Sequence, residues 1–198
     1  MCIKLLAAVL MQYQVSCRLT LKGEDDTMEF ATKCIHEIGA ADATSACLGA
    51  LDAWLVIRGI KTLPLRMEQH QKNAFAIAKW LQKQLRVQYV LYPGLENHPG
   101  YVINKAQTTS FGGMISFAVD NAETARQILE GVKLIKFAES LGGTESLITY
   151  PIRQTHTDLT AEECAEKGIT DCLLRFSTGI EATQDLIDDL AQAFAVIE

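Results

Sequence analysis

From residue 48 to the carboxy terminus, short apolar segments alternate with segments of helical periodicity. Met114–Val119 is an apolar, strand-like run, and Asp120 and Asn121 are suited to cap a helix from about Ala122 to Glu130. A second strand is predicted at Val132–Phe137. Because a strand, a helix and another strand follow one another closely, the sequence predicts an α/β (α+β) fold, a small sheet with helices packed on one face.

A long helical segment precedes this part of the chain. Apolar residues recur at helical spacing between Leu48 and Leu85, and Gly59 and Pro64 interrupt the pattern, which predicts two consecutive helices. The apolar stripe of the second helix is interpreted as core rather than as a cofactor site. The stripe consists of Met67, Ala74, Ile77, Ala78, Leu81 and Leu85.

The carboxy-terminal part adds a strand between two more helices. Thr160 and Glu163 are spaced as a capping box, so a helix is predicted to begin there and to end by Gly168. Cys172–Phe176 is a compact strand, and the last helix is predicted to start near Thr183. These elements extend the predicted sheet and the helical layer.

The composition narrows the class of protein. With 198 residues and 48% hydrophobic side chains, the chain is long enough to bury a core in one or two domains of a soluble globular protein. The net charge of -6 and the pI near 5.3 argue against nucleic acid or an anionic membrane surface as the main partner, since either needs a clustered basic face. No segment approaches the roughly 20 apolar residues that span a bilayer.

The cysteines and the first residues favour a location in the cytoplasm. Six cysteines are scattered without a Cys-x-x-Cys pair, which predicts reduced thiols in a cytoplasmic protein. The apolar run Leu5–Met11 has some likeness to a short signal peptide, but its charged start is thin and no small-residue cleavage site clearly follows. A strand or a short helix is therefore the preferred interpretation.

The histidines and their neighbours do not predict a metal site or a nucleophilic triad. Cys34 and His36 face different sides of a predicted helix, so they do not form a metal pair. His98 stands in a proline-rich loop with no second ligand close by in the sequence. His156 and Asp158 share a polar loop, but no serine or cysteine is paired with them in the sequence.

The stretch Ala138–Leu147 is the first candidate for a functional site. It places polar, titratable and glycine-rich residues directly after the predicted strand at 132–137. Gly142 and Gly143 allow a turn or a close approach to a ligand, while Glu139 and Ser140 offer an acceptor and a hydroxyl. The pattern by itself also fits an ordinary glycine turn with a solvated glutamate.

Arg175 is the second candidate, because it interrupts an otherwise apolar strand. A guanidinium in such a place either reaches solvent at a sheet edge or meets a carboxylate in a bidentate pair. From the pattern alone, a structural ion pair is preferred slightly over a ligand site.

Several short motifs follow one another along the chain and can be compared together. They include Leu51-Asp52-Ala53-Trp54-Leu55, Arg58-Gly59-Ile60-Lys61-Thr62-Leu63, Tyr92-Pro93-Gly94-Leu95, Phe111-Gly112-Gly113-Met114, Glu139-Ser140-Leu141-Gly142-Gly143, Thr155-His156 and Leu174-Arg175-Phe176-Ser177. In this order they resemble the trans-sulfuration (Cys/Met metabolism) family of pyridoxal-phosphate (PLP) enzymes, which includes cystathionine γ-synthase, cystathionine γ- and β-lyases and methionine γ-lyase. The resemblance extends from about Leu19 to Phe194.

The resemblance implies a domain organisation and an activity. Residues 48–198 are expected to form the carboxy-terminal domain of a fold-type I PLP enzyme, and residues 1–47 a remnant of the large cofactor domain with an unmatched start. The expected chemistry makes or breaks carbon-sulfur bonds of sulfur amino acids, in the manner of a γ-synthase or γ-lyase. The implied cofactor is pyridoxal 5'-phosphate, and family members are homo-oligomers.

The resemblance also implies roles for four residues. Arg175 is expected to hold the α-carboxylate of the substrate, and Ser140 to lie beside both the cofactor and the substrate. Glu139 is expected to line the pocket for the amino-acid side chain, and its identity is closer to the γ-acting members than to the β-lyases. Thr155 is expected to neighbour the carboxylate site.

The lysine that binds the cofactor in this family is not found in the printed sequence. Ala31-Thr32-Lys33 resembles the motif that carries it, but Lys33 lies on the exposed face of a predicted helix, and its distance to Leu51 is too short. The better register sets Leu19–Ala40 after that lysine, which is then expected upstream of Met1. The chain alone is therefore expected to bind the cofactor poorly and to be inactive. The alternative is a non-catalytic α/β fragment that associates with full-length subunits.

Overall fold

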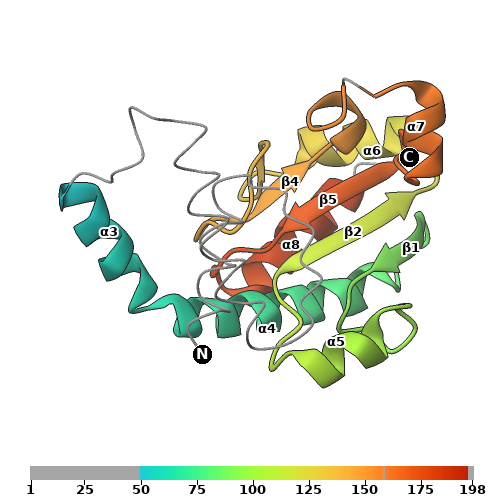
Figure 1. The fold of residues 1–198 in the computed structure, drawn as a ribbon. Coiled ribbons are helices and arrows are strands. Elements are labelled where there is room, and N and C mark those ends of the chain that lie inside the picture. Colours follow the sequence, from blue (N-terminus) through green and yellow to red (C-terminus); the bar gives the residue numbers. More distant parts are fainter. Residues whose placement is uncertain (1–49, 158, 196–198) are drawn as a thin grey trace. The chain divides into compact units, whose positions relative to one another are not determined.

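The computed structural model describes residues 50–157 and 159–195, and the chain divides into two units, Met1–Leu63 and Pro64–Glu198. The sheet belongs to the second unit (Figure 1). The domain boundary expected between residues 47 and 48 stays a prediction. The sequence predictions for Lys33, Cys34, His36 and Asp158 lie outside the described residues.

The two helices predicted between residues 48 and 85 are present. Helix α3 spans Ala50–Ile60, and α4 spans Leu63–Leu81. The turn after α3 is closed by the backbone N–H and the hydroxyl of Thr62, which donate to the carbonyl oxygen of Gly59 at 3.4 and 3.3 Å. Pro64 stands in the first turn of α4, where its missing N–H removes no intrahelical hydrogen bond. The break therefore lies where glycine and proline predicted it.

The sheet has five strands in the order β1-β2-β5-β4-β3. They are β1 (Val87–Leu91), β2 (Met114–Val119), β3 (Lys136–Phe137), β4 (Leu147–Thr149) and β5 (Leu173–Ser177). The pairs β1/β2, β2/β5 and β4/β5 are antiparallel, and β3/β4 is parallel. The central strand β5 thus comes from near the end of the chain.

Two helices of the second unit, α6 and α7, begin at side-chain caps that the sequence predicted. Helix α6 (Ala122–Gly131) starts where Asn121 accepts a hydrogen bond from the backbone N–H of Thr124. Helix α7 (Ala161–Glu166) starts at the predicted capping box of Thr160 and Glu163.

The remaining helical elements are short except for the last. Helix α5 spans Tyr101–Gln107, and the 3-10 turn η1 spans Pro151–Arg153. Helix α8 spans Thr183–Ala195 and contacts α6.

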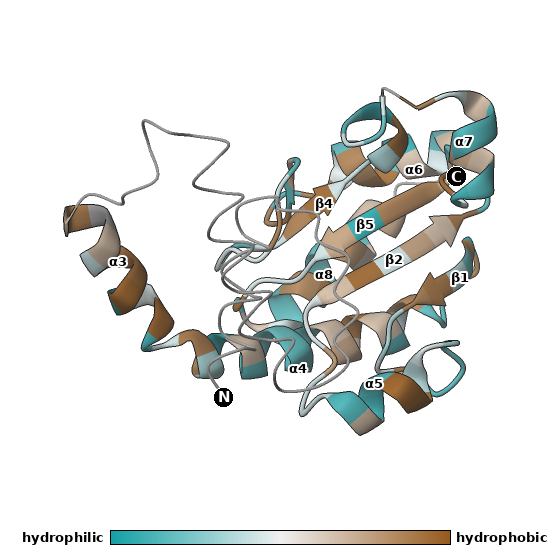
Figure 2. Ribbon diagram, viewed as in Figure 1, coloured by the Kyte–Doolittle hydropathy of each residue, from teal (hydrophilic) through white to brown (hydrophobic). Residues whose placement is uncertain are grey.

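One face of the sheet forms the core with α4, α6 and α8, which lie on the same side of it in Figure 1. Alternate residues of the strands point to these helices, so the strands read as hydrophobic in Figure 2. This arrangement confirms the predicted α/β class with helices on one face. The fully buried members include Ile77, Leu81, Ile115, Phe117, Ile128, Ile148, Leu174, Phe176, Leu186 and Leu190.

Two sequence predictions were wrong in extent. The strand predicted at Val132–Phe137 is reduced to Lys136–Phe137, because the carboxylate of Asp189 on α8 accepts the backbone N–H groups of residues 133, 134 and 135. Those N–H groups are therefore not available to a neighbouring strand. Leu85, predicted in the core stripe, is fully exposed, because α4 ends at Leu81 and the chain turns away.

Within residues 50–157 and 159–195, no helix combines the length and the hydropathy needed to cross a membrane.

Candidate functional site

Arg175 lies on the face of the sheet opposite the core helices. Its neighbours in β5, Leu174 and Phe176, are fully buried on the core face, so strand alternation directs Arg175 to the other face. In register beside it stand Ser116 of β2 and Thr149 of β4. Figure 2 shows the corresponding hydrophilic band across the otherwise hydrophobic β5.

The guanidinium of Arg175 has donors that the described residues do not satisfy. Its Nη2 donates to the hydroxyl of Thr149 at 3.4 Å, whereas its buried Nε has no hydrogen-bond partner. Partial burial lowers the pKa of Arg175 from its ordinary value, and the negative charge of Glu139 opposes that shift. A buried, unpaired donor is costly unless a partner reaches it, so the geometry suits an anionic ligand.

The predicted structural ion pair of Arg175 was wrong. Within residues 50–157 and 159–195, no carboxylate forms an ion pair with this guanidinium. Glu139 acts on it electrostatically without forming an ion pair. The physical reason is position, because Arg175 sits on the central strand and its two neighbours in register carry hydroxyls rather than carboxylates.

The loop that carries Glu139 and Ser140 is held on the same face by strand side chains. The hydroxyl of Thr149 donates to the carbonyl oxygen of Ala138 at 2.9 Å. At the other side of the loop, the backbone N–H of Gly142 donates to the hydroxyl of Ser177 at 3.0 Å. Both Glu139 and Ser140 remain exposed, so their polar groups are available to a ligand.

Glycine is required at two positions of this crossing between loop and strand. Gly142 has a φ of 76°, a conformation that other residues rarely adopt. A Cβ on Gly179, just after β5, would lie 2.4 Å from the carbonyl oxygen of Thr144. The loop and the end of β5 therefore pack backbone to backbone.

A half-buried carboxylate fixes the far end of the loop. Glu181 accepts the backbone N–H of Ser146 at 2.6 Å with Oε1 and the hydroxyl of Ser146 at 2.9 Å with Oε2. The same hydroxyl accepts the backbone N–H of Gly179 at 2.8 Å. Ser146 thus joins the loop to the segment that follows β5 through three hydrogen bonds, which keeps the loop in register with β5.

Helix α4 contributes two buried polar side chains to this region. The amide nitrogen of Asn73 donates to the carbonyl oxygens of Gly179 and Glu181 at 3.0 and 2.9 Å, and its oxygen accepts from the hydroxyl of Thr183. His70 is hydrogen-bonded through Nδ1 to the carbonyl oxygen of Thr178. These contacts tie the end of β5 to α4.

Sequence reasoning missed several residues that shape the site. Thr149 and Ser177 were overlooked, although strand alternation puts Ser177 on the face of Arg175. Asn73 was visible as a polar residue within the apolar stripe of the second predicted helix. Glu181 had no local signal, because its partner Ser146 is 35 residues away.

Thr155 lies just after η1. Its hydroxyl shares a hydrogen bond of 2.7 Å with Nδ1 of His156, and its backbone N–H donates to the carbonyl oxygen of Pro151. Among the described contacts, none joins Thr155 to Arg175. Its place beside the carboxylate therefore stays a prediction.

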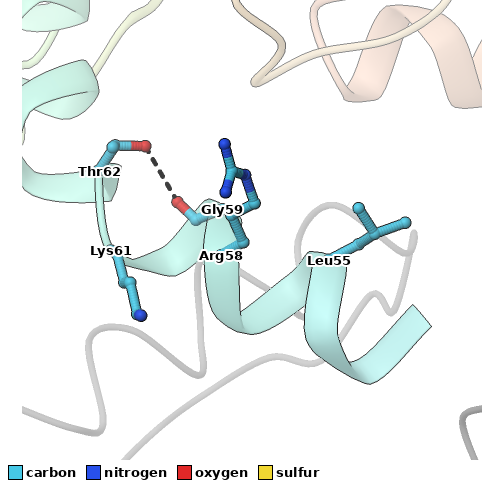
Figure 3. A pocket seen from close by; sticks show the side chains of 5 residues that line it. All are labelled: Leu55, Arg58, Gly59, Lys61 and Thr62. Atoms are coloured by element: carbon cyan, nitrogen blue, oxygen red, sulfur yellow. Dashed lines mark hydrogen bonds between the residues drawn. The ribbon is translucent and has the colours of Figure 1, made fainter. Parts of the chain in front are cut away.

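A hollow of about 470 Å³ lies at the carboxy-terminal end of α3 and contains none of the four predicted site residues (Figure 3). Its two cationic side chains favour a helix carboxy terminus, where the dipole is negative, and Arg58 also lies over the ring of Trp54. The helix dipole and the Trp54 ring therefore explain the cationic side chains of this hollow without a ligand. It is lined by Leu55, Arg58, Gly59, Lys61 and Thr62.

Comparison with protein families decides the affiliation. The model of the Cys/Met metabolism PLP-dependent enzymes matches residues 19–195, which is most of the chain. The chain belongs to this family. The trans-sulfuration family is PLP-dependent, so the expected family and cofactor class are confirmed.

Curated relatives in the trans-sulfuration family cover several activities. The chain is 48% identical to the cystathionine gamma-lyase of Bacillus subtilis over 152 residues, which are 77% of this chain and 40% of the relative. It is 46% identical to an L-methionine gamma-lyase of Fusobacterium nucleatum over 82% of this chain and 42% of the relative. A cystathionine beta-lyase of Lactococcus lactis is 47% identical, over 79% of this chain and 42% of the relative. The chain thus spans about two fifths of the length of these relatives.

Solved structures of trans-sulfuration enzymes share the fold. The cystathionine gamma synthase of Xanthomonas oryzae, in complex with aminoacrylate and cysteine, matches with a TM-score of 0.71 and 44% identity over 73% of this chain and 38% of that chain. The metB protein of Corynebacterium glutamicum matches with a TM-score of 0.76 and 37% identity over 86% of this chain and 43% of that chain.

The described residues fit one side of a site for an amino acid and the family cofactor. Nε of Arg175, which has no partner in the described part of the chain, suits an anionic ligand, and the exposed Ser140 hydroxyl stands in the loop docked beside it. Recognition of a carboxylate needs such donors. The hollow on α3 is not counted as part of this site, because its residues belong to the other unit of the chain.

Proposed function

We propose that this chain forms the substrate-carboxylate side of a PLP-dependent enzyme that acts on carbon-sulfur bonds of sulfur amino acids, as a γ-synthase or γ-lyase. The observation that carries the proposal is Arg175, a half-buried guanidinium beside the Glu139–Ser140 loop whose Nε has no hydrogen-bond partner among the described residues. Family membership supplies the reaction class, and the guanidinium supplies the contact with the substrate.

Each side chain has a distinct part in the proposed mechanism. Arg175 binds the α-carboxylate with its planar fork, and partial burial strengthens that contact because few water molecules compete. Pyridoxal phosphate, when bound, accepts the electron pair released at the substrate carbon. Ser140 donates its hydroxyl beside the cofactor and the substrate, and Thr155 supports the carboxylate side.

Glu139 is the residue that favours γ-chemistry in this proposal. Its carboxylate is exposed, and its negative charge acts on Arg175, so it lies within electrostatic range of the proposed carboxylate site. Overall identity does not discriminate between reactions, since γ-lyases and β-lyases match equally well. The assignment therefore rests on the glutamate.

The carboxylate assignment is tested by titrating the full chain with L-methionine and with L-methioninamide, followed by NMR. We expect L-methionine to shift signals from β5 and the 138–143 loop with a dissociation constant of roughly 1 mM. This affinity corresponds to a binding free energy of about 4 kcal/mol. The amide should produce none of these shifts, because it lacks the carboxylate. Equal responses to both compounds, or no response to either, would overturn the assignment.

We further propose that no lysine of the printed sequence binds the cofactor covalently, so that the chain by itself is inactive. The support is the position of Lys33 in the preferred register. Titration with pyridoxal phosphate should produce no stable absorption band of protein-bound cofactor. A stable band that disappears in the Lys33→Ala variant would show that the register is wrong.

A second candidate function is a non-catalytic α/β domain that associates with full-length subunits. The observation that favours it is the exposed apolar surface of α3, where Leu51, Trp54 and Ile57 are 67%, 55% and 56% exposed. Co-purification with a complete homologue would support it, and a strictly monomeric chain would count against it.

Under either proposed function, we place the protein in the cytoplasm.

A further inference from the structure

Thr149 connects the guanidinium of Arg175 to the loop that carries Glu139 and Ser140. Its hydroxyl accepts a hydrogen bond from Nη2 of Arg175 at 3.4 Å and donates one to the carbonyl oxygen of Ala138 at 2.9 Å. A hydroxyl has one hydrogen and two lone pairs, so both contacts form at the same time. Thr149 is 1% exposed, so water does not compete for its hydroxyl.

The backbone around Thr149 makes this connection rigid. The preceding residue, Ile148, accepts the backbone N–H of Ala138 at 3.1 Å, and Thr149 itself pairs with Arg175 across the β4/β5 ladder. Arg175 therefore lies on the strand next to Thr149, and Ala138, which directly follows β3, is hydrogen-bonded to β4. A β-branched side chain in a strand has few rotamers, which keeps the hydroxyl in place.

We propose that Thr149 is a positioning residue that holds the Arg175 guanidinium and the Glu139–Ser140 loop in one relative geometry. It thereby sets the distance between the group that binds the α-carboxylate and the groups that face the rest of the amino acid. This inference rests on the proposed role of Arg175 in substrate binding.

Loss of the hydroxyl has a definite consequence for Arg175. Within residues 50–157 and 159–195, the Thr149 hydroxyl is the partner of the one side-chain hydrogen bond that Arg175 makes. Without it, the guanidinium is free to rotate, and a ligand must order that group when it binds. Ordering a long side chain on binding weakens affinity, and misplacement of a binding group adds to the loss.

Two substitutions separate the hydroxyl from the shape of the side chain. Thr149→Val keeps the β-branched shape and removes the hydroxyl, whereas Thr149→Ser keeps the hydroxyl and removes the methyl group. Ser116→Ala is the matched control, because Ser116 is the neighbour of Arg175 on the opposite side and makes no hydrogen bond to it among the described residues.

The first measurement needs no ligand. In the full chain labelled with ¹⁵N-arginine, the Nε–H signal of Arg175 is assigned by its loss in Arg175→Met, and rotation about the Nε–Cζ bond is followed by NMR exchange. We expect slow rotation in the unsubstituted protein, in Thr149→Ser and in Ser116→Ala. Rotation in Thr149→Val should be at least about threefold faster.

The second measurement is the affinity for L-methionine by NMR titration. We expect Thr149→Val to bind roughly five- to tenfold more weakly, and Thr149→Ser to restore binding to within about twofold. Unchanged rotation in Thr149→Val, or a serine variant as impaired as the valine variant, would overturn the proposal. If neither the unsubstituted protein nor any variant binds methionine, the proposed function fails. The rotation measurement still decides the role of Thr149.

Discussion

Replacing Arg175 with methionine is expected to weaken binding of L-methionine by roughly 10- to 100-fold while leaving the fold as stable as before or more so. A hydrogen bond to a charged group contributes about 1.5–3 kcal/mol, which is the loss expected at the carboxylate. In the free protein the same substitution removes a buried Nε that has no partner among residues 50–157 and 159–195. Methionine fills the space of the aliphatic stem without a charge to bury.

The opposite signs of the two effects identify Arg175 as a functional residue. NMR titration with L-methionine gives the affinity, and urea unfolding gives the free energy of unfolding, which should rise by up to about 1 kcal/mol. The control is Arg126→Met on α6, where the guanidinium pairs with the exposed Glu123 and Glu130. It should leave the affinity unchanged. Binding that survives in Arg175→Met would exclude the proposed carboxylate contact.

Replacing Asp189 with alanine is expected to reduce the free energy of unfolding by about 3 kcal/mol. Asp189 is 7% exposed, and its carboxylate accepts the backbone N–H groups of Lys133, Leu134 and Ile135 at 2.9, 3.0 and 2.9 Å. Alanine leaves these donors without their acceptor and detaches the segment from α8. Asp189→Asn should cost less, because one amide oxygen still accepts.

The neighbouring Asp188 supplies the control for this prediction. Its carboxylate is exposed and accepts from the side chain of Gln184 on the same helix. Asp188→Ala should change the free energy of unfolding by no more than about 0.5 kcal/mol. Hydrogen exchange should accelerate at the amides of residues 133–135 in Asp189→Ala alone. A loss below about 1 kcal/mol would mean that the carboxylate does not hold this segment.

Local patterns predicted much of the fold of residues 50–195. The strand Met114–Val119 and the capping box at Thr160 appear where the sequence placed them, because alternation and capping act over a few residues. The strand at Val132–Phe137 was overestimated, since a carboxylate some 55 residues away takes its N–H groups. No local pattern contains that competition.

The candidate site was predictable to the extent that its residues are conspicuous in the sequence. Arg175 interrupts an apolar strand, and Glu139 and Ser140 stand in a glycine-rich stretch, so each was a candidate. Thr149 was not, because a threonine is an ordinary strand residue until its partners are known. Its importance comes from register, which sets it beside Arg175.

The sequence by itself determined the family, most of the helices and strands and the identity of the groups that can meet a substrate. Collinear motifs and short-range periodicity carry that information. Only the tertiary structure decided that Nε of Arg175 has no partner among the described residues, that the Glu139–Ser140 loop docks on its face, and that Asn73, Glu181 and Asp189 hold the surrounding segments. These facts depend on hydrogen bonds between residues far apart in the chain, and the partner in each is chosen by sheet register and helix packing.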